Sequence, residues 1–326
     1  MGRPRALVAV LAACLLLAGC GSGPSQVGAA ILFSDHEVTQ DQVQQLIDKA
    51  VREQPAAQQL SQQHKLDLLG RELVSQLVLH DAIGRAARSE GLVADANVVN
   101  QTLAQDPLAQ PLSTTNVDPS QLARQIAFRV RDHREAITDQ LLMQELGARY
   151  FPTMSVSFDY TSVVADQGGA QPASTREQAF AKVQQMATDP GAPARVIQSD
   201  AAAGEQASVG EKVPAVQSPD LAATVLYGVQ PGTVVAFQPS VQDGTWIVAV
   251  VRARDLRTPQ AVDSASEPTA SELVAIGARL LQPFVDESGM KINPRYGVWD
   301  PVAMDVAPSA AETTGLVLSV KGSAQP

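Results

Sequence analysis

Residues 118–161 read DPSQLARQIAFRVRDHREAITDQLLMQELGARYFPTMSVSFDYT, and the change of pattern within them decides the fold. Asp118 and Pro119 suit the N-cap and the first position of a helix. Apolar residues then recur at helical spacing. From Met154 onward, apolar and polar residues alternate instead, which is typical of a half-buried strand. The sequence therefore predicts a helical domain before this point and an α+β domain after it.

The segment before this stretch predicts a short strand followed by helices. The strand is expected at 30–33, and Thr39 and Gln42 form a capping box in front of an amphipathic helix. Two further helices follow, the first of them over 61–89, before the helix that begins at Asp118. Residues 30–152 are expected to form one helical domain.

The segment after the stretch predicts a compact domain over 153–257, a common domain size. Strands are expected at 234–237 and 246–251, joined by a hairpin turn at 243–244. A linker rich in Pro, Ser and Ala covers 258–268.

One more helix is expected near the C-terminus, within a segment over 269–303. Thr269 and Glu272 form its capping box. An apolar stripe from Leu273 to Phe284 requires a partner, and we expect the helices of the N-terminal domain to supply it. The tail 304–326 is rich in Ala, Ser, Thr and Pro and is expected to be disordered.

The first 19 residues resemble a signal peptide. Arg3 and Arg5 precede an apolar run over 6–18, and small residues follow. This run is too short to span a bilayer, which requires about 20 apolar residues.

Leu17-Ala18-Gly19-Cys20 resembles the lipobox of bacterial lipoproteins. The resemblance implies cleavage before Cys20, lipid attachment to its thiol, and a tether over 20–29 that holds the protein on the extracytoplasmic face of the cell membrane. An ordinary secretory signal that ends in cysteine is the alternative. Because Cys14 lies in the discarded part, the mature chain can form no intramolecular disulfide.

Composition excludes several classes of function. The formal net charge of −10 becomes −12 when Arg3 and Arg5 leave with the signal peptide, and only 24 residues are Lys or Arg, which argues against nucleic-acid binding. Aromatic residues make up 4%, which argues against a carbohydrate or nucleobase site. The histidines have no ligand spacing, so neither a metal site nor a cofactor is expected; they are His36, His64, His80 and His133.

The order of a helical domain, a small α+β domain and a late helix resembles SurA-like and PrsA-like extracytoplasmic foldases. Residues 30–39 resemble their opening strand and helix, and residues 90–98 their turn between the second and third helices. Residues 221–234 and 243–250 resemble the end of a parvulin domain. NPRYGVWD, residues 293–300, is similar to a segment of actinobacterial lipoproteins that have a SurA-type N-terminal domain.

The resemblance implies that both ends of the chain contribute to one domain, and that the chain has lost catalytic activity. The N-terminal helices and the late helix would build one SurA-like chaperone domain, with the parvulin-like domain inserted between them. Active parvulins use two histidines, whose positions correspond to Thr161 and Trp246 in this chain. Since all four histidines precede the parvulin-like domain, that domain is interpreted as degenerate. No catalytic residue is assigned, and the absence of these histidines argues against enzymatic activity.

Three residues of NPRYGVWD are candidate interface residues: Arg295, Tyr296 and Trp299. Alternatively, Arg295 pins the segment to the helical domain through a carboxylate.

The sequence therefore predicts a membrane-anchored extracytoplasmic chaperone that binds unfolded or nascent secreted and envelope proteins without covalent chemistry. A peptidyl-prolyl isomerase with a non-standard site is one alternative. A non-catalytic scaffold subunit of an envelope complex is another.

Overall fold

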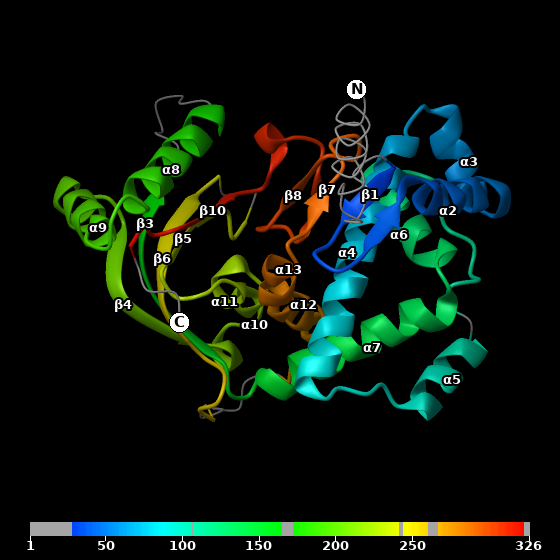
Figure 1. Ribbon diagram of the computed structural model, residues 1–326. Coiled ribbons are helices and arrows are strands. Elements are labelled where there is room, and N and C mark those ends of the chain that lie inside the picture. Colours follow the sequence, from blue (N-terminus) through cyan, green and yellow to red (C-terminus); the bar gives the residue numbers. More distant parts are fainter. Residues whose placement is uncertain (1–27, 106, 165–171, 241–243, 260–266, 323–326) are drawn as a thin grey trace, which may run out of the picture.

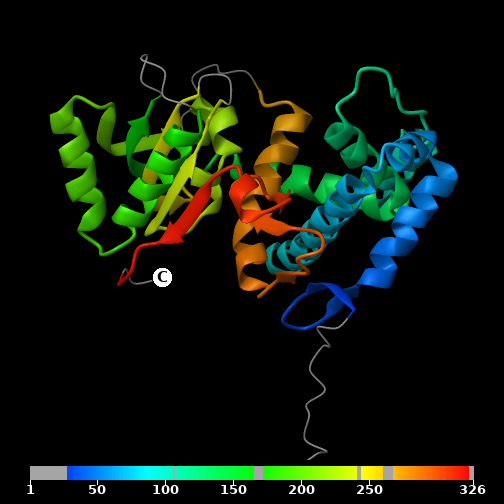
Figure 2. The same cartoon turned by 90° about the horizontal axis from the view of Figure 1, so that it is seen from above.

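The computed structural model describes residues 28–322 except 106, 165–171, 241–243 and 260–266, and only the backbone of 172–174. The predicted signal peptide, Cys20 and most of the linker lie outside the described residues. The fold is α+β, as predicted, with a helical lobe and a sheet lobe on either side of a central layer (Figures 1 and 2). In the described part of the chain, no helix has the length and apolar character needed to cross a membrane.

The helical lobe contains two short strands and six helices of the described chain. In order they are β1 (Ala29–Leu32), β2 (Glu37–Thr39), α2 (Gln40–Glu53), α3 (Pro55–Gln62), α4 (Leu66–Glu90), α5 (Ala96–Gln105), α6 (Pro119–Val130) and α7 (His133–Tyr150). The capping box of Thr39 and Gln42 is present, and Asp118 caps α6 by accepting from two backbone N–H groups.

Two helices that the sequence predicts as continuous are divided. The helix over 61–89 is preceded by the separate α3, and His64 adopts a left-handed conformation (φ 56°) between α3 and α4. The helix that begins at Asp118 ends at Val130, and the side chain of Asp132 accepts from the N–H of Glu135 to start α7. An aspartate at an N-cap was the signal for this break, but the apolar spacing continues across it.

The sheet lobe contains an antiparallel sheet in the order β10-β5-β6-β3-β4. Helices α8 and α9 cover one face of the sheet, and the one-turn helices α10 and α11 lie on the other (Figure 1). The elements in chain order are β3 (Ser155–Val163), α8 (Pro172–Met186), α9 (Ala192–Ala203), β4 (Ala207–Pro214), α10 (Pro219–Ala222), α11 (Val225–Gly228), β5 (Thr233–Phe237) and β6 (Trp246–Asp255).

The expectation of a disordered tail is wrong for residues 305–322. Strand β9 (Asp305–Ala307) pairs with β8 (Val298–Asp300), and β10 (Leu316–Ser319) pairs with β5. Without β10, the buried strand β5 would leave its backbone groups unpaired at the edge of the sheet. Leu316 and Leu318 also pack onto the apolar cluster below α8. Only 323–326 of the tail lie outside the described residues.

Helix α12 (Ala270–Leu280), with α13 (Gln282–Glu287) after it, forms the central layer between the lobes (Figure 1). It crosses α7 at backbone contact: a Cβ atom on Gly277 would lie 1.8 Å from the main-chain oxygen of Met143, and one on Gly147 would lie 2.0 Å from that of Leu273. The prediction that the late helix packs on the N-terminal helices is confirmed. Beyond it, β7 (Lys291–Ile292) pairs with β1, so both ends of the chain build the helical lobe.

We expect Gly277→Ala to destabilise the protein. The new methyl group would force α7 and α12 apart, and such overpacking costs about 1–3 kcal/mol. Gly84→Ala in α4 is the matched control, because its Cβ atom would meet only Nη1 of Arg88, at 3.5 Å, and alanine favours a helix. Urea unfolding should show a lower midpoint for the first variant and an equal or higher one for the second. An unchanged midpoint for Gly277→Ala would contradict the close crossing.

Candidate functional site

The helical lobe contains a pocket of about 280 Å³ between α4, α6, α7 and residues 303–305, which we call the helical groove. Its lining combines apolar and charged side chains. The apolar lining consists of Leu79, Ile83, Phe128, Met143 and Met304, and the polar lining of Glu72, Ser75, Gln76, Arg124, Arg131, Asp139 and Asp305.

Helical periodicity places these side chains together. On α4, Glu72, Gln76, Leu79 and Ile83 follow one another at intervals of three or four residues and so share one face. Arg124 and Phe128 on α6 are four residues apart, as are Asp139 and Met143 on α7. Each of the three helices thus contributes at least one apolar and one charged residue to the groove.

Glu72 is one of two buried carboxylates that line the groove, and it has the weaker ion pairing of the two. Nη2 of Arg124 lies 3.3 Å from Oε1 of Glu72 and 2.9 Å from Oδ2 of Asp305, so one guanidinium serves two carboxylates. Burial raises the pKa of Glu72 to about 7, and the negative charge of Asp305 adds to that rise against the effect of Arg124. The positive charge of Arg124 therefore offsets the cost of burying the Glu72 carboxylate only in part.

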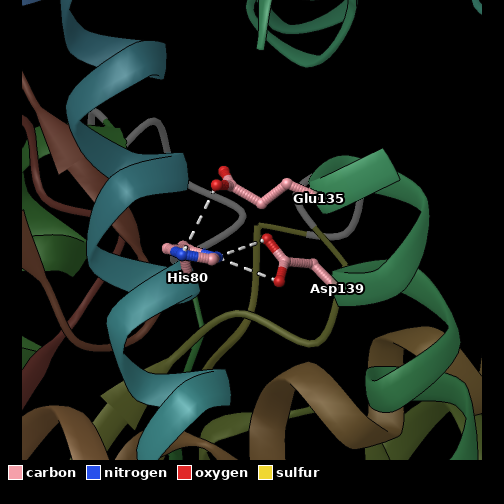
Figure 3. Close-up of side chains that lie close together, drawn as sticks. All are labelled: His80, Glu135 and Asp139. Carbon is pink, nitrogen blue, oxygen red and sulfur yellow. Dashed lines mark hydrogen bonds and ion pairs between the residues drawn. The ribbon is translucent and has the colours of Figure 1, made fainter. Parts of the chain in front are cut away.

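A second charged cluster borders the groove and contains His80, Glu135 and Asp139 (Figure 3). Nδ1 of His80 lies 2.9 Å from Oδ2 of Asp139, and its Nε2 lies 3.8 Å from Oε2 of Glu135. The hydrogen bond with Asp139 raises the pKa of His80, and the charges of both carboxylates support the rise against the effect of burial. His80 comes from α4 and the two acids from α7, so the cluster ties these helices together.

These three residues have the chemistry of metal ligands, with one ligand atom of each within 4.8 Å of the others. However, Nη2 of the buried Arg131 donates to Oε1 of Glu135 at 2.6 Å and to Oδ2 of Asp139 at 2.5 Å. A cation would compete with this guanidinium for the same oxygen atoms. We therefore interpret the cluster as an ion-pair network of two cations and two anions when His80 is protonated.

The sheet lobe carries an open pocket of about 340 Å³, which we call the sheet pocket. It lies on the face of the sheet that α8 and α9 leave uncovered. Its lining is mostly apolar and consists of Phe158, Tyr160, Gln206, Glu211, Leu221, Leu226, Phe237, Pro239 and Ile247.

The positions at which the family resemblance implies histidines do not line this pocket. Thr161 is 0% and Trp246 4% exposed. Trp246 packs edge-to-face on Phe180 with ring centroids 5.6 Å apart, under α8. Both therefore belong to the helix-covered face of the sheet. Tyr160 precedes Thr161 in the strand and therefore lies on the opposite face of the sheet, where it lines the pocket.

The candidate interface residues of NPRYGVWD have different environments. Tyr296 is buried against Gly70 and Ile47, so it is a core residue and not an interface residue. Trp299 is half-buried, and its Nε1–H has no acceptor among the described residues. Arg295 is exposed, and no carboxylate of the described chain forms an ion pair with it.

Sequence patterns did not single out Glu72, Arg124 or Asp305. One signal was available, and it concerned Glu72. This charged residue lies between Leu69 and Leu73, on the apolar face of a predicted helix. Asp305 lies in the segment that composition marked as disordered.

Comparison of the chain with models of known protein families, with curated proteins and with solved structures gives no match. The assignment of a function therefore depends on the geometry of these sites.

We expect His80→Gln to destabilise the protein more at pH 5.5 than at pH 9. Because the folded-state pKa of His80 is raised above its ordinary value of 6.5, the protonated ring stabilises the fold fully below about pH 6.5, and this contribution is lost as the pH rises through the folded-state pKa. The ring is partly exposed, so solvent screening keeps the effect small. Urea unfolding at both pH values measures it; an equal loss at both would contradict a charged His80–Asp139 pair.

Proposed function

We propose that this chain is a membrane-anchored extracytoplasmic chaperone of the SurA and PrsA type, which binds unfolded or nascent secreted and envelope proteins. The observation that carries the proposal is the helical groove. Leu79, Phe128 and Met143 come from three different helices and stay half-buried at one concave surface. Half-buried apolar side chains in a hollow can accept apolar side chains of an unfolded chain.

The architecture supports the family part of the proposal. A late helix packs on the N-terminal helices, and an α+β unit is inserted between them. The lipobox-like Leu17-Ala18-Gly19-Cys20 supports the anchored, extracytoplasmic location.

The energetics of such a groove suit binding followed by release. Burying one large apolar side chain contributes about 1.5–3 kcal/mol. Two or three client side chains contribute about 3–9 kcal/mol, and the cost of association reduces this sum, so each client segment binds weakly. Binding of this kind requires no covalent chemistry.

The sheet pocket favours a second candidate function, prolyl isomerisation at a non-standard site. Its apolar lining would accept a proline ring, and Tyr160 and Glu211 are its titratable groups. The last histidine of the chain is His133, outside the sheet lobe, so the imidazole network of active parvulins has no counterpart here. Isomerisation stays the second candidate function, and without catalysis the apolar lining of the pocket would still bind client segments.

We expect the whole mature chain to suppress the aggregation of a heat-denatured test protein, and Phe128→Gln to weaken this suppression. The variant removes one apolar wall of the groove, so about tenfold more protein should be required for the same effect. Val93→Gln is the matched control, since Val93 is 80% exposed and lies outside both pockets. Light scattering reads the result, with urea unfolding to verify that both variants are folded.

Two outcomes would change the assignment. No suppression by the unsubstituted chain would refute the chaperone proposal. Acceleration of X–Pro isomerisation in a proline peptide, lost in Tyr160→Phe, would instead support the isomerase.

We expect Cys20→Ser to leave the precursor uncleaved and without lipid, because the lipobox chemistry requires a thiol. Mass spectrometry of the membrane fraction measures both changes. A normally processed Cys20→Ser protein that is still retained on the membrane would refute the lipid anchor.

A further inference from the structure

Charge in the helical groove is not balanced. Of its lining residues, three are carboxylates (Glu72, Asp139 and Asp305) and two are guanidinium groups (Arg124 and Arg131). Three negative and two positive charges leave one negative charge when all are ionised. Protonated His80 beside Asp139 is offset by Glu135, which Arg131 also contacts.

The unbalanced charge belongs to Glu72. Asp139 is held by Arg131 at 2.5 Å and by His80 at 2.9 Å. Asp305 takes the shorter contact to Arg124, 2.9 Å against 3.3 Å for Glu72, and is also in contact with Ser75. The other nearby cation, Arg71, pairs with Asp67 at 2.9 Å. Glu72 thus shares one guanidinium with Asp305, and this agrees with its raised pKa.

A second acceptor lies one helical turn further along α4. Oε1 of Gln76 is buried and has no hydrogen-bond donor among the described residues. Gln76 and Glu72 are four residues apart, so both side chains lie on the face of α4 that lines the groove. Two acceptors, one of them anionic, require a group with several N–H donors. Ammonium and guanidinium groups provide these donors together with a positive charge.

The apolar walls suit the rest of such a side chain. Lysine and arginine carry their charge at the end of a hydrocarbon stem, which packs on apolar surfaces while the head finds polar partners. Leu79, Phe128 and Met143 offer that surface beside the two acceptors. A purely aliphatic side chain would leave Glu72 with Arg124 as its donor among the described residues and Oε1 of Gln76 with none.

We infer that the helical groove selects basic segments of unfolded clients, by binding the stem of a lysine or arginine against its apolar walls and the cationic head at Glu72 and Gln76. This inference rests on the proposed chaperone function and specifies its substrate class. The net charge of −10 attracts basic segments over longer distances in addition.

Three dye-labelled model peptides that differ only in one central residue, lysine, norleucine or glutamate, test the inference on the whole mature chain. Fluorescence anisotropy at pH 8 should show the lysine peptide bound about tenfold more tightly than the norleucine peptide, and the glutamate peptide bound most weakly. Glu72→Gln should remove the preference for lysine, so that the lysine and norleucine peptides bind with similar affinity. Glu145→Gln on α7, outside the groove, removes the same charge and should keep the preference.

The pH dependence provides a measurement that requires no variant. At pH 5.5 Glu72 is largely protonated, so the preference for lysine should be severalfold smaller than at pH 8. Equal affinities of the lysine and norleucine peptides, or an equal loss of preference in both variants, would overturn the inference and leave the chaperone proposal intact. Failure of all three peptides to bind would overturn both.

Discussion

The arrangement of the two lobes depends on the backbone contact between α7 and α12. At Gly147 and Gly277 the helices approach until main-chain atoms touch, which no residue with a side chain would allow. Because α12 also contacts α10 and α11, this crossing fixes the distance between the helical lobe and the sheet lobe. Met143, whose carbonyl meets Gly277, has its side chain in the wall of the helical groove. The depth of the groove therefore depends on the same contact.

Arg279 extends this constraint to the C-terminal segment. It is almost fully buried, and its N–H groups donate to the carbonyl oxygens of Ala223, Pro301 and Val302 and to Oε1 of Gln282. Burial lowers the pKa of Arg279 to about 10, yet the guanidinium stays charged at neutral pH. One side chain thus satisfies carbonyl groups of the sheet lobe and of the hairpin that closes the groove. Removing it would leave those carbonyl groups buried without donors.

Local signals in the sequence predicted many of the elements, and the apolar stripe of the late helix predicted its packing on the N-terminal helices. Individual strand and side-chain pairings between distant residues were beyond these signals. The capping residues Thr39, Asp118 and Thr269 act through neighbouring backbone groups, so their spacing along the chain suffices. Strand β10 was missed because a short run such as Leu316–Ser319 becomes a strand only beside the free edge of β5. Asp159 in β3 accepts hydrogen bonds from Arg252 and from the N–H of Gly210, partners that alternation along the strand does not predict. The groove, likewise, unites residues as far apart as Glu72 and Asp305, which no periodicity connects.

The pairing of β1 with β7 has a consequence for how the protein matures. The first strand of the helical lobe completes its sheet only with residues 291–292, and the sheet lobe receives its last strand from 316–319. A chain that is synthesised from its N-terminus therefore completes neither lobe until nearly all of it is available. Contacts of such long sequence separation slow folding, and the helical groove, whose lining includes residues 303–305, is complete only after this late segment has packed on α4. Incomplete chains of the protein therefore lack the complete groove.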